Sequence, residues 1–230
     1  IAILKRDRKL FVMNSSCNRP VRIDENPGMA TSTTNESAPH AGETPPTCVV
    51  VLLAAGAGSR FHDDRHKLWA EIADNGTGPL RTIIERSLSS ALAADIGPIV
   101  VVTGCVADVV PTDLAHAVTV CHNDRWSEGQ ITSLHCALAA ARSLGATCVV
   151  VGLADQPFID PAAWRAVAHA SGPIAVATYD GRRANPVKLD AAVWDLLPTT
   201  GDEGARSLMR VRPDLVREVA CTGSPADIDT

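Results

Sequence analysis

The sequence lacks an excess of basic over acidic residues, and it lacks any apolar run long enough to cross a membrane. The formal net charge of its 230 residues is -5 and the sequence pI is about 5.8, so no global positive field is available to hold a polyanion. We therefore expect no nucleic-acid partner. The longest apolar runs have the length of strands, far short of the ~20 residues of a membrane helix. We expect a soluble protein without a membrane partner.

The sequence also lacks closely spaced cysteines. Its seven cysteines are an odd number, are scattered without a CxxC pair, and several lie inside apolar runs, where a thiol behaves as a small hydrophobic group. This usage indicates a reducing cytoplasm and argues against a disulfide framework and against a cysteine-built zinc site. The seven histidines show no metal-ligand spacing, and no nucleophile triad is visible.

The first 46 residues differ from the rest in composition. Charges interrupt the apolar residues of ILKRDRKLFVM, so no signal peptide is predicted, and residues 14–46 are rich in Ser, Thr, Asn and Pro. Position 1 is Ile, which indicates a fragment or an early translation start, with Met13 and Met29 as candidate true starts. We expect 1–46 to be a disordered or mis-started extension and 47–230 to be one domain.

From Cys48 onward, apolar strand-like runs alternate with helical patterns. Strands are predicted at 48–54, 98–104, 117–122, 147–155 and 173–180, and helices at 80–95, 131–145 and 161–170, with a weaker helix around Pro111. After Tyr179 we expect a hairpin at 180–181, a short strand, short helices at 191–197 and 203–211, and a last strand at 215–220. The alternation predicts an α/β fold, a single Rossmann-like three-layer domain with a mostly parallel sheet. Ligands of such sheets bind beyond the carboxyl ends of the strands.

A glycine turn, AAGAGSRF, follows the first predicted strand. It is not a dinucleotide fingerprint, because Phe61 stands where the third Gly is needed, and it is not a Walker A loop, because Ser and Arg follow Gly58. What remains is a turn whose backbone N–H groups can face an anion, with Arg60 and Lys67 able to reach the same charge. This combination favours a nucleoside triphosphate as ligand.

The segment LAAGAGSRF, followed by Lys67 and Leu68, resembles the signature of the molybdenum cofactor nucleotidyltransferases. Those nine residues also fit sugar-phosphate and methylerythritol-phosphate nucleotidylyltransferases. Three later stretches, NDRWSEGQITSL (123–134), GLADQPF (152–158) and GDEGAR (201–206), are similar to further motifs of the molybdenum cofactor family. LAAG, where the guanylyl branch usually carries LAGG, favours the cytidylyltransferase branch. Two departures are Asn185, where the family often has His, and the end of the chain at Thr230, where relatives continue into a closing helix.

The resemblance implies a nucleotide-diphospho-sugar transferase-like fold and a domain at 47–230 that is truncated at its C-terminus. The implied reaction transfers CMP from CTP, or NMP from another nucleoside triphosphate, to the phosphate of a molybdopterin cofactor, with Mg²⁺ and release of pyrophosphate. A molybdoenzyme would receive the product. Three alternatives stay open: a GTP-using enzyme, a sugar- or polyol-phosphate nucleotidylyltransferase, and a non-catalytic cofactor-binding chaperone.

The candidate site residues follow from strand ends and from the resemblance. Asp155 ends a buried apolar strand at the ligand-binding edge, which favours a metal ligand over a turn cap. The resemblance implies Asp229 as second metal ligand. The expected catalytic residues are Arg60, Lys67 and Asp155, and the acceptor-binding residues are Asp202 and Arg206, for which a surface helix pair is the alternative. The expected nucleotide-binding residues are Leu53, Ala54, Ala55, Gly56, Gly58, Ser59, Arg60, Lys67, Asn123, Gly129 and Ser133.

Overall fold

The computed structural model describes residues 47–58, 66–73 and 79–228. The predicted extension 1–46 and the candidate residues Ser59, Arg60 and Asp229 lie outside this part of the chain. The strands are β1 (Cys48–Ala54), β2 (Glu71–Ala73), β3 (Leu80–Thr82), β4 (Ile99–Thr103), β5 (Thr119–His122), β6 (Cys148–Leu153), β7 (Ile174–Tyr179), β8 (Arg182–Asp190) and β9 (Val216–Ala220). The α-helices are α1 (Ile83–Ala93), α2 (Gln130–Ser143), α3 (Pro161–Ala168) and α4 (Arg206–Val211). Short 3-10 helices are η1 (Lys67–Trp69), η3 (Ala115–Ala117), η4 (Trp126–Glu128), η5 (Ala191–Leu196) and η6 (Pro213–Leu215).

The main sheet has seven strands in the order β5-β4-β1-β6-β8-β7-β9. Every neighbouring pair is parallel except the two pairs made by β8, which runs antiparallel to both β6 and β7. The predicted turn after β7 forms at Asp180 and Gly181, whose φ angles are 49° and 75°, and it returns the chain as β8 into the interior of the sheet. The predicted α/β fold with a mostly parallel sheet is therefore confirmed.

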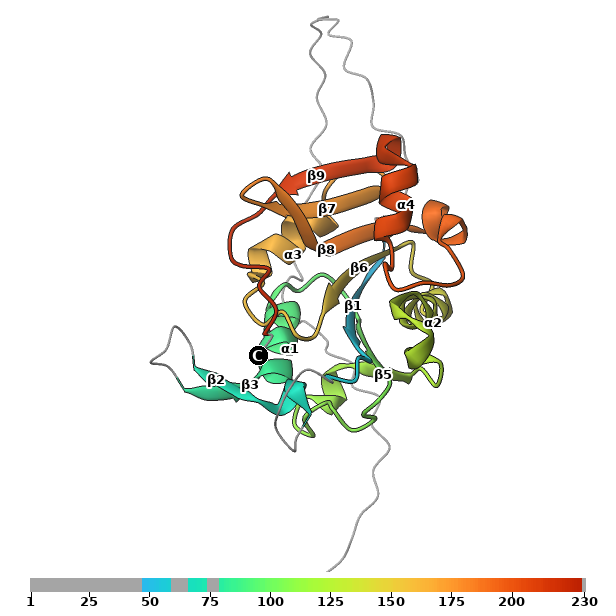
Figure 1. The fold of residues 1–230 in the computed structure, drawn as a ribbon. Coiled ribbons are helices and arrows are strands. Elements are labelled where there is room, and N and C mark those ends of the chain that lie inside the picture. Colours follow the sequence, from blue (N-terminus) through green and yellow to red (C-terminus); the bar gives the residue numbers. More distant parts are fainter. Residues whose placement is uncertain (1–46, 59–65, 74–78, 229–230) are drawn as a thin grey trace, which may run out of the picture. The chain divides into compact units, whose positions relative to one another are not determined.

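Helices cover both faces of the sheet, so its central strands are buried on both sides. Figure 1 shows α1 and α3 on one side of the sheet and α2 and α4 on the other. All seven residues of β1 are buried, as its continuous apolar run predicts. Gly152 in β6 leaves room for the ring of Trp164 from α3, because a Cβ at that position would lie within 3 Å of two ring carbons. No helix among the described residues is long and apolar enough to span a membrane.

Three local predictions differ from the structure. The helix predicted at 80–95 begins at Ile83, where Thr82 and Glu85 form a capping box, while Leu80–Thr82 instead pair with β2 in a two-stranded ribbon. The weaker helix around Pro111 is not formed; the chain there makes turns and the short η3. The segment 191–197 folds as the 3-10 helix η5.

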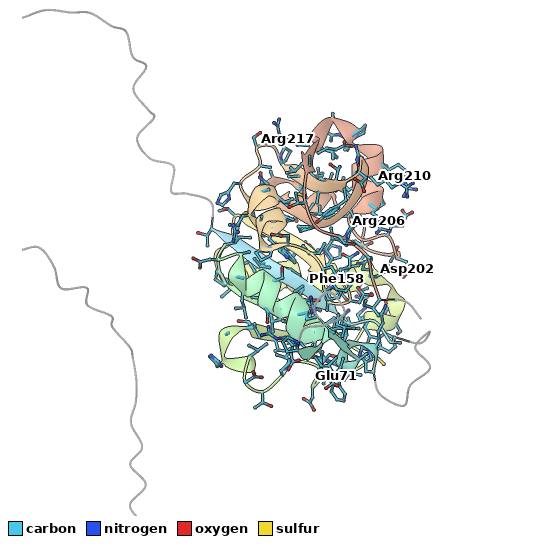
Figure 2. All side chains as sticks on the ribbon, turned by 90° about the vertical axis from the view of Figure 1, so that its left-hand side faces the viewer. Glu71, Phe158, Asp202, Arg206, Arg210 and Arg217 are labelled. Carbon is cyan, nitrogen blue, oxygen red and sulfur yellow. A yellow bond between two sulfur atoms is a disulfide. The ribbon has the colours of Figure 1, made fainter. Side chains whose placement is uncertain are left out.

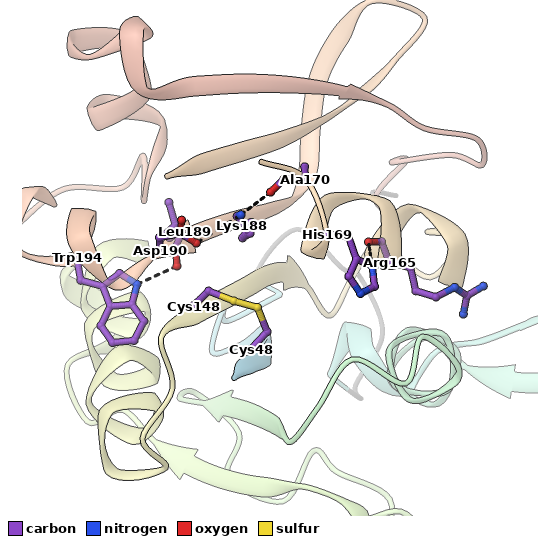
Figure 3. Close-up of a disulfide and its surroundings, with 9 residues drawn as sticks. All are labelled: Cys48, Cys148, Arg165, His169, Ala170, Lys188, Leu189, Asp190 and Trp194. Carbon is purple, nitrogen blue, oxygen red and sulfur yellow. Dashed lines mark hydrogen bonds and ion pairs between the residues drawn. A yellow bond between two sulfur atoms is a disulfide. The ribbon is translucent and has the colours of Figure 1, made fainter. Parts of the chain in front are cut away.

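A disulfide joins the first residues of β1 and β6, and this corrects the expectation drawn from cysteine spacing. Cys48 and Cys148 are register partners on adjacent strands, with their Cα atoms 4.6 Å apart and their sulfurs bonded (Figure 3). They are 100 residues apart in the sequence, so their proximity depends on the strand order. Trp194 and Lys188 lie nearby, donating to the carbonyls of Leu189 and Ala170 respectively.

Candidate active site

A cleft of about 460 Å³ lies at the carboxyl ends of β1 and β6, the edge where a parallel sheet binds its ligands. The glycine turn after β1, the segment after β6 and the start of α2 all contribute to its wall. We call it the first cleft. Its lining residues include Leu53, Ala54, Ala55, Gly56, Gly58, His66, Lys67, Trp126, Gly129, Gln130, Ser133, Asp155, Asp202, Asp227 and Ile228.

Lys67 and Asp155 form an ion pair inside the first cleft. The Lys67 Nζ lies 3.1 Å from the Asp155 Oδ2, and the two side chains are 10% and 29% exposed. Lys67 is the first residue of η1, and Asp155 follows the end of β6 by two residues. The pair brings a cation for phosphate and a carboxylate for a metal ion to one point.

His66 holds the glycine turn, a role that the sequence did not reveal. Its Nδ1 accepts a hydrogen bond from the Leu68 backbone N–H at 3.4 Å, so the neutral ring carries its proton on Nε2. That nitrogen lies 2.9 Å from the Gly56 carbonyl oxygen and donates to it. Gly58 adopts φ of 59°, and a Cβ there would lie 3.1 Å from the Cβ of Lys67. The turn therefore requires glycine and is pinned beside the lysine.

Asn123 lies behind the wall of the first cleft. Its buried amide donates to the hydroxyls of Thr132 and Ser133, at 2.9 and 3.0 Å, and its Oδ1 accepts from the Arg125 N–H. Its hydrogen-bonding groups thus hold the start of α2. Ser133, 3% exposed, faces the cleft, and no described residue accepts a hydrogen bond from its hydroxyl. A ligand atom that accepts hydrogen bonds would satisfy this proton.

A second cleft of about 320 Å³ adjoins the first, and both share Leu53 and Gln130 as lining residues. Besides the shared Leu53 of β1, its larger apolar side chains come from three further strands and two helices, namely Val151, Val176, Val187, Leu189, Leu134 and Met209. Three arginines border it. Arg183 pairs with Glu218 and Arg210 with Glu203, whereas none of the described residues forms an ion pair with Arg206. Figure 2 shows Arg206, Arg210 and Asp202 on the same side of the molecule.

The described candidate residues are gathered around these clefts. The residues of β1 and its turn, Lys67, Gly129, Ser133 and Asp155 all line the first cleft. The expected acceptor pair is divided, because Asp202 lines the first cleft and Arg206 the second. Trp126 and Asp227 also line the first cleft. Neither was among the candidate residues named from the sequence.

The family of the protein follows from a comparison of its sequence with family profiles. Residues 50–218 match the profile of the MobA-like NTP transferase domain. The chain belongs to this family. It is a nucleotidyltransferase of the MobA-like kind, which confirms the family predicted from the motifs. A comparison with curated proteins found no significant match.

Solved structures of the same fold support this assignment. Rv0371c from Mycobacterium tuberculosis H37Rv is 26% identical, with a TM-score of 0.66 over 81% of this chain and 95% of that one. The same protein in complex with manganese gives a TM-score of 0.64 at 26% identity, covering 80% and 94% of the two chains. A nucleotidyl transferase from Methanothermobacter thermautotroptrophicus is 25% identical, with a TM-score of 0.63 over 76% and 88%.

Proposed function

We propose that the protein transfers CMP from CTP to the terminal phosphate of a molybdopterin-type acceptor and releases pyrophosphate. The observation that carries the proposal is the pair of adjoining clefts, which meet at Leu53 and Gln130. One cleft holds the glycine turn with the Lys67–Asp155 pair, and the other has an apolar surface bordered by arginines. A reaction between two phosphate-bearing substrates needs such neighbouring sites.

The first cleft suits a nucleoside triphosphate. Lys67 would stabilise the negative charge that develops on the leaving pyrophosphate, and the place of Arg60 after the glycine turn in the sequence suggests the same task for it. The Ser133 hydroxyl offers a proton to a carbonyl oxygen or ring nitrogen of the base. Both cytosine and guanine carry such acceptors, so the preference for CTP rests on the LAAG segment at 53–56.

The residues of this cleft fit a magnesium ion. Mg²⁺ keeps several waters and takes one or two protein carboxylates together with substrate phosphates. Asp155 offers one carboxylate, Asp227 lies in the same wall, and the resemblance adds Asp229. The described residues contain no group of three or more His, Cys, Asp or Glu arranged for a metal. Bound there, the ion would neutralise charge on the transferring phosphoryl group.

The second cleft suits the acceptor. A flat heteroaromatic ring can pack on the valine and leucine side chains of the sheet, and Arg206 at the border can pair with an acidic group. An acceptor phosphate is already ionised at neutral pH, so its oxygen needs no general base. That oxygen would bond to the α-phosphorus of CTP as the bond from α-phosphorus to the pyrophosphate oxygen breaks. Asp202, in the first cleft, would lie beside the reacting phosphates.

Pyrophosphate release tests the proposal. Purified protein is incubated with Mg²⁺ and with CTP, GTP, ATP or UTP, each with and without molybdenum-loaded molybdopterin. Release with CTP that depends on the pterin is the expected result. Release with GTP, or with sugar or polyol phosphates in place of the pterin, would replace the proposal with the corresponding alternative enzyme.

A carrier makes a different prediction. A cofactor chaperone would bind CTP or the pterin, measured by calorimetry, with no pyrophosphate formed under any condition.

We further propose that the product passes to a molybdoenzyme in the cytoplasm, and that 47–230 constitutes the nucleotidyltransferase domain. To test the transfer, the protein carrying labelled product is mixed with a molybdoenzyme, the molybdoenzyme is purified again, and the label bound to it is measured.

A further inference from the structure

The segment that leads to the end of the described chain forms part of the wall of the first cleft. Asp227 and Ile228 line that cleft. The segment Ser224–Ile228 runs beside the residues that follow β6: the Ser224 N–H donates to the Phe158 carbonyl and the Ile228 N–H to the Asp155 carbonyl, both at 3.2 Å. These backbone bonds tie the segment to Asp155, the proposed metal ligand.

A side-chain contact between these two backbone bonds fastens the segment as well. The Gln156 Nε2 donates to the Pro225 carbonyl oxygen at 2.9 Å. Because a carbonyl oxygen can only accept, the Gln156 amide has one orientation, with its Oε1 turned away from Pro225. The Gln156 side chain is buried, at 8% exposure, so both ends of its amide need partners.

Asn185 of β8 is the partner of that other end. Its Nδ2 donates to the Gln156 Oε1 at 3.0 Å. Asn185 lines the second cleft, and Pro225 belongs to the segment that walls the first. A chain of two hydrogen bonds, from Asn185 to Gln156 and from Gln156 to Pro225, therefore runs from the acceptor side of the site to the nucleotide side. We call this chain the relay.

We propose that Asn185 is a positioning residue, whose carboxamide orients Gln156 and thereby holds Ser224–Ile228 in place as a wall of the nucleotide cleft. The essential property of Asn185 is its donor, because the Gln156 Oε1 requires one. A side chain of the same shape without a donor would turn the Gln156 amide around and place its oxygen against the Pro225 carbonyl. The relay would then fail at Pro225.

Asn185→Asp and Asn185→His test this donor requirement. Asparagine and aspartate have the same shape, but the ionised carboxylate cannot donate, whereas an imidazole N–H can. Amide hydrogen exchange is measured at Ser224 and Ile228, with the amides of β1 as an internal control for the fold. Asn185→Asp should speed exchange at both amides about tenfold, Asn185→His should leave it within about twofold of the parent protein, and β1 should not change in either.

Gln156→Met gives a second route to the same result, because it removes both hydrogen bonds while keeping the length of the side chain. It should speed exchange at Ser224 and Ile228 as Asn185→Asp does. Unchanged exchange in Asn185→Asp would overturn the proposal. Equal acceleration in Asn185→Asp and Asn185→His would also overturn it, since shape rather than donation would then be decisive.

A kinetic readout connects the relay to the nucleotide, and only this part rests on the proposed function. Gln156→Met, whose side chain lines neither cleft, should raise the KM for CTP about fivefold and leave kcat within about twofold. An unchanged KM together with faster exchange would refute the link to the nucleotide cleft. If the protein released no pyrophosphate at all, the proposed function would fail while the exchange test still decided the relay.

Discussion

The Lys67–Asp155 ion pair allows its contribution to stability to be separated from its contribution to catalysis. The variants are Lys67→Met, Asp155→Asn and the double substitution. At 3.1 Å the Coulomb attraction between the charges is about 5 kcal/mol for an effective dielectric constant of about 20. Desolvation of the lysine, whose side chain is 10% exposed, cancels much of this attraction. We expect a coupling free energy of about 1–2 kcal/mol in the double-mutant cycle.

The single substitutions should differ from the double one in stability. Asp155→Asn removes the Asp155 charge from beside a largely buried ammonium group, so the free energy of unfolding should fall by about 1–3 kcal/mol. Lys67→Met leaves a carboxylate that is 29% exposed, for which water compensates in part, so its loss should be smaller. The double variant should be no less stable than Asp155→Asn. Urea unfolding with the disulfide intact measures all three.

Turnover should follow a different pattern, because the proposed transfer uses Lys67 and Asp155 for separate tasks. Each single substitution should lower kcat for pyrophosphate release by about 10²–10³-fold, and the double variant should recover nothing. Asp195→Ala is the matched control: its carboxylate is 92% exposed and pairs with Arg142 at the surface. It should cost at most about 1 kcal/mol and leave kcat unchanged. Turnover within tenfold of the parent in Asp155→Asn would refute the catalytic assignment.

Three further predictions concern the core and the thiols. Gly152→Ala should lower the free energy of unfolding by about 1–3 kcal/mol, because the new methyl group overlaps the ring of Trp164; an unchanged urea midpoint would mean that the ring moves freely. Alkylation followed by mass spectrometry should leave Cys48 and Cys148 unmodified until a reductant is added, and modification without reductant would contradict the disulfide. Burial raises the pKa of Cys136 above its usual 9.0, so its thiolate fraction and alkylation rate at pH 8 should be below those of a model thiol. Its rate should rise as the pH is increased through 9, and a rate equal to the model thiol at pH 8 would contradict the burial effect.

The buried strands could be predicted because their residues have no polar face. β1, β4 and β6 are continuous β-branched runs, and such a run has few alternatives in an α/β chain. Their carboxyl ends then indicated Asp155 and the glycine turn as site residues. The ribbon of β2 and β3 was missed because each strand has three residues, too few for periodicity to distinguish from the start of a helix.

Contacts that depend on strand order could not be predicted in the same way. Cys48 and Cys148 became neighbours only because β6 lies beside β1 in register. Asn123 was expected to bind the nucleotide; in the structure its three hydrogen bonds to Arg125, Thr132 and Ser133 direct its amide to the start of α2. The role of a polar residue next to a site thus depends on which of its atoms are already bonded.

The single reversed strand explains how one sheet can carry two adjoining clefts. Because β8 lies between β6 and β7, its residues Asn185, Val187 and Leu189 form part of the second cleft, next to the β6 residue Val151. The first cleft depends on β1, its glycine turn and the start of α2, and does not use β8. Apart from Asn185, whose bond to Gln156 reaches the wall of the first cleft, changes in β8 and α4 can therefore alter the acceptor side with little effect on the nucleotide side. On this reasoning, the identity of the acceptor should be sought in residues 183–210, and the choice of base in 53–58 and 129–133.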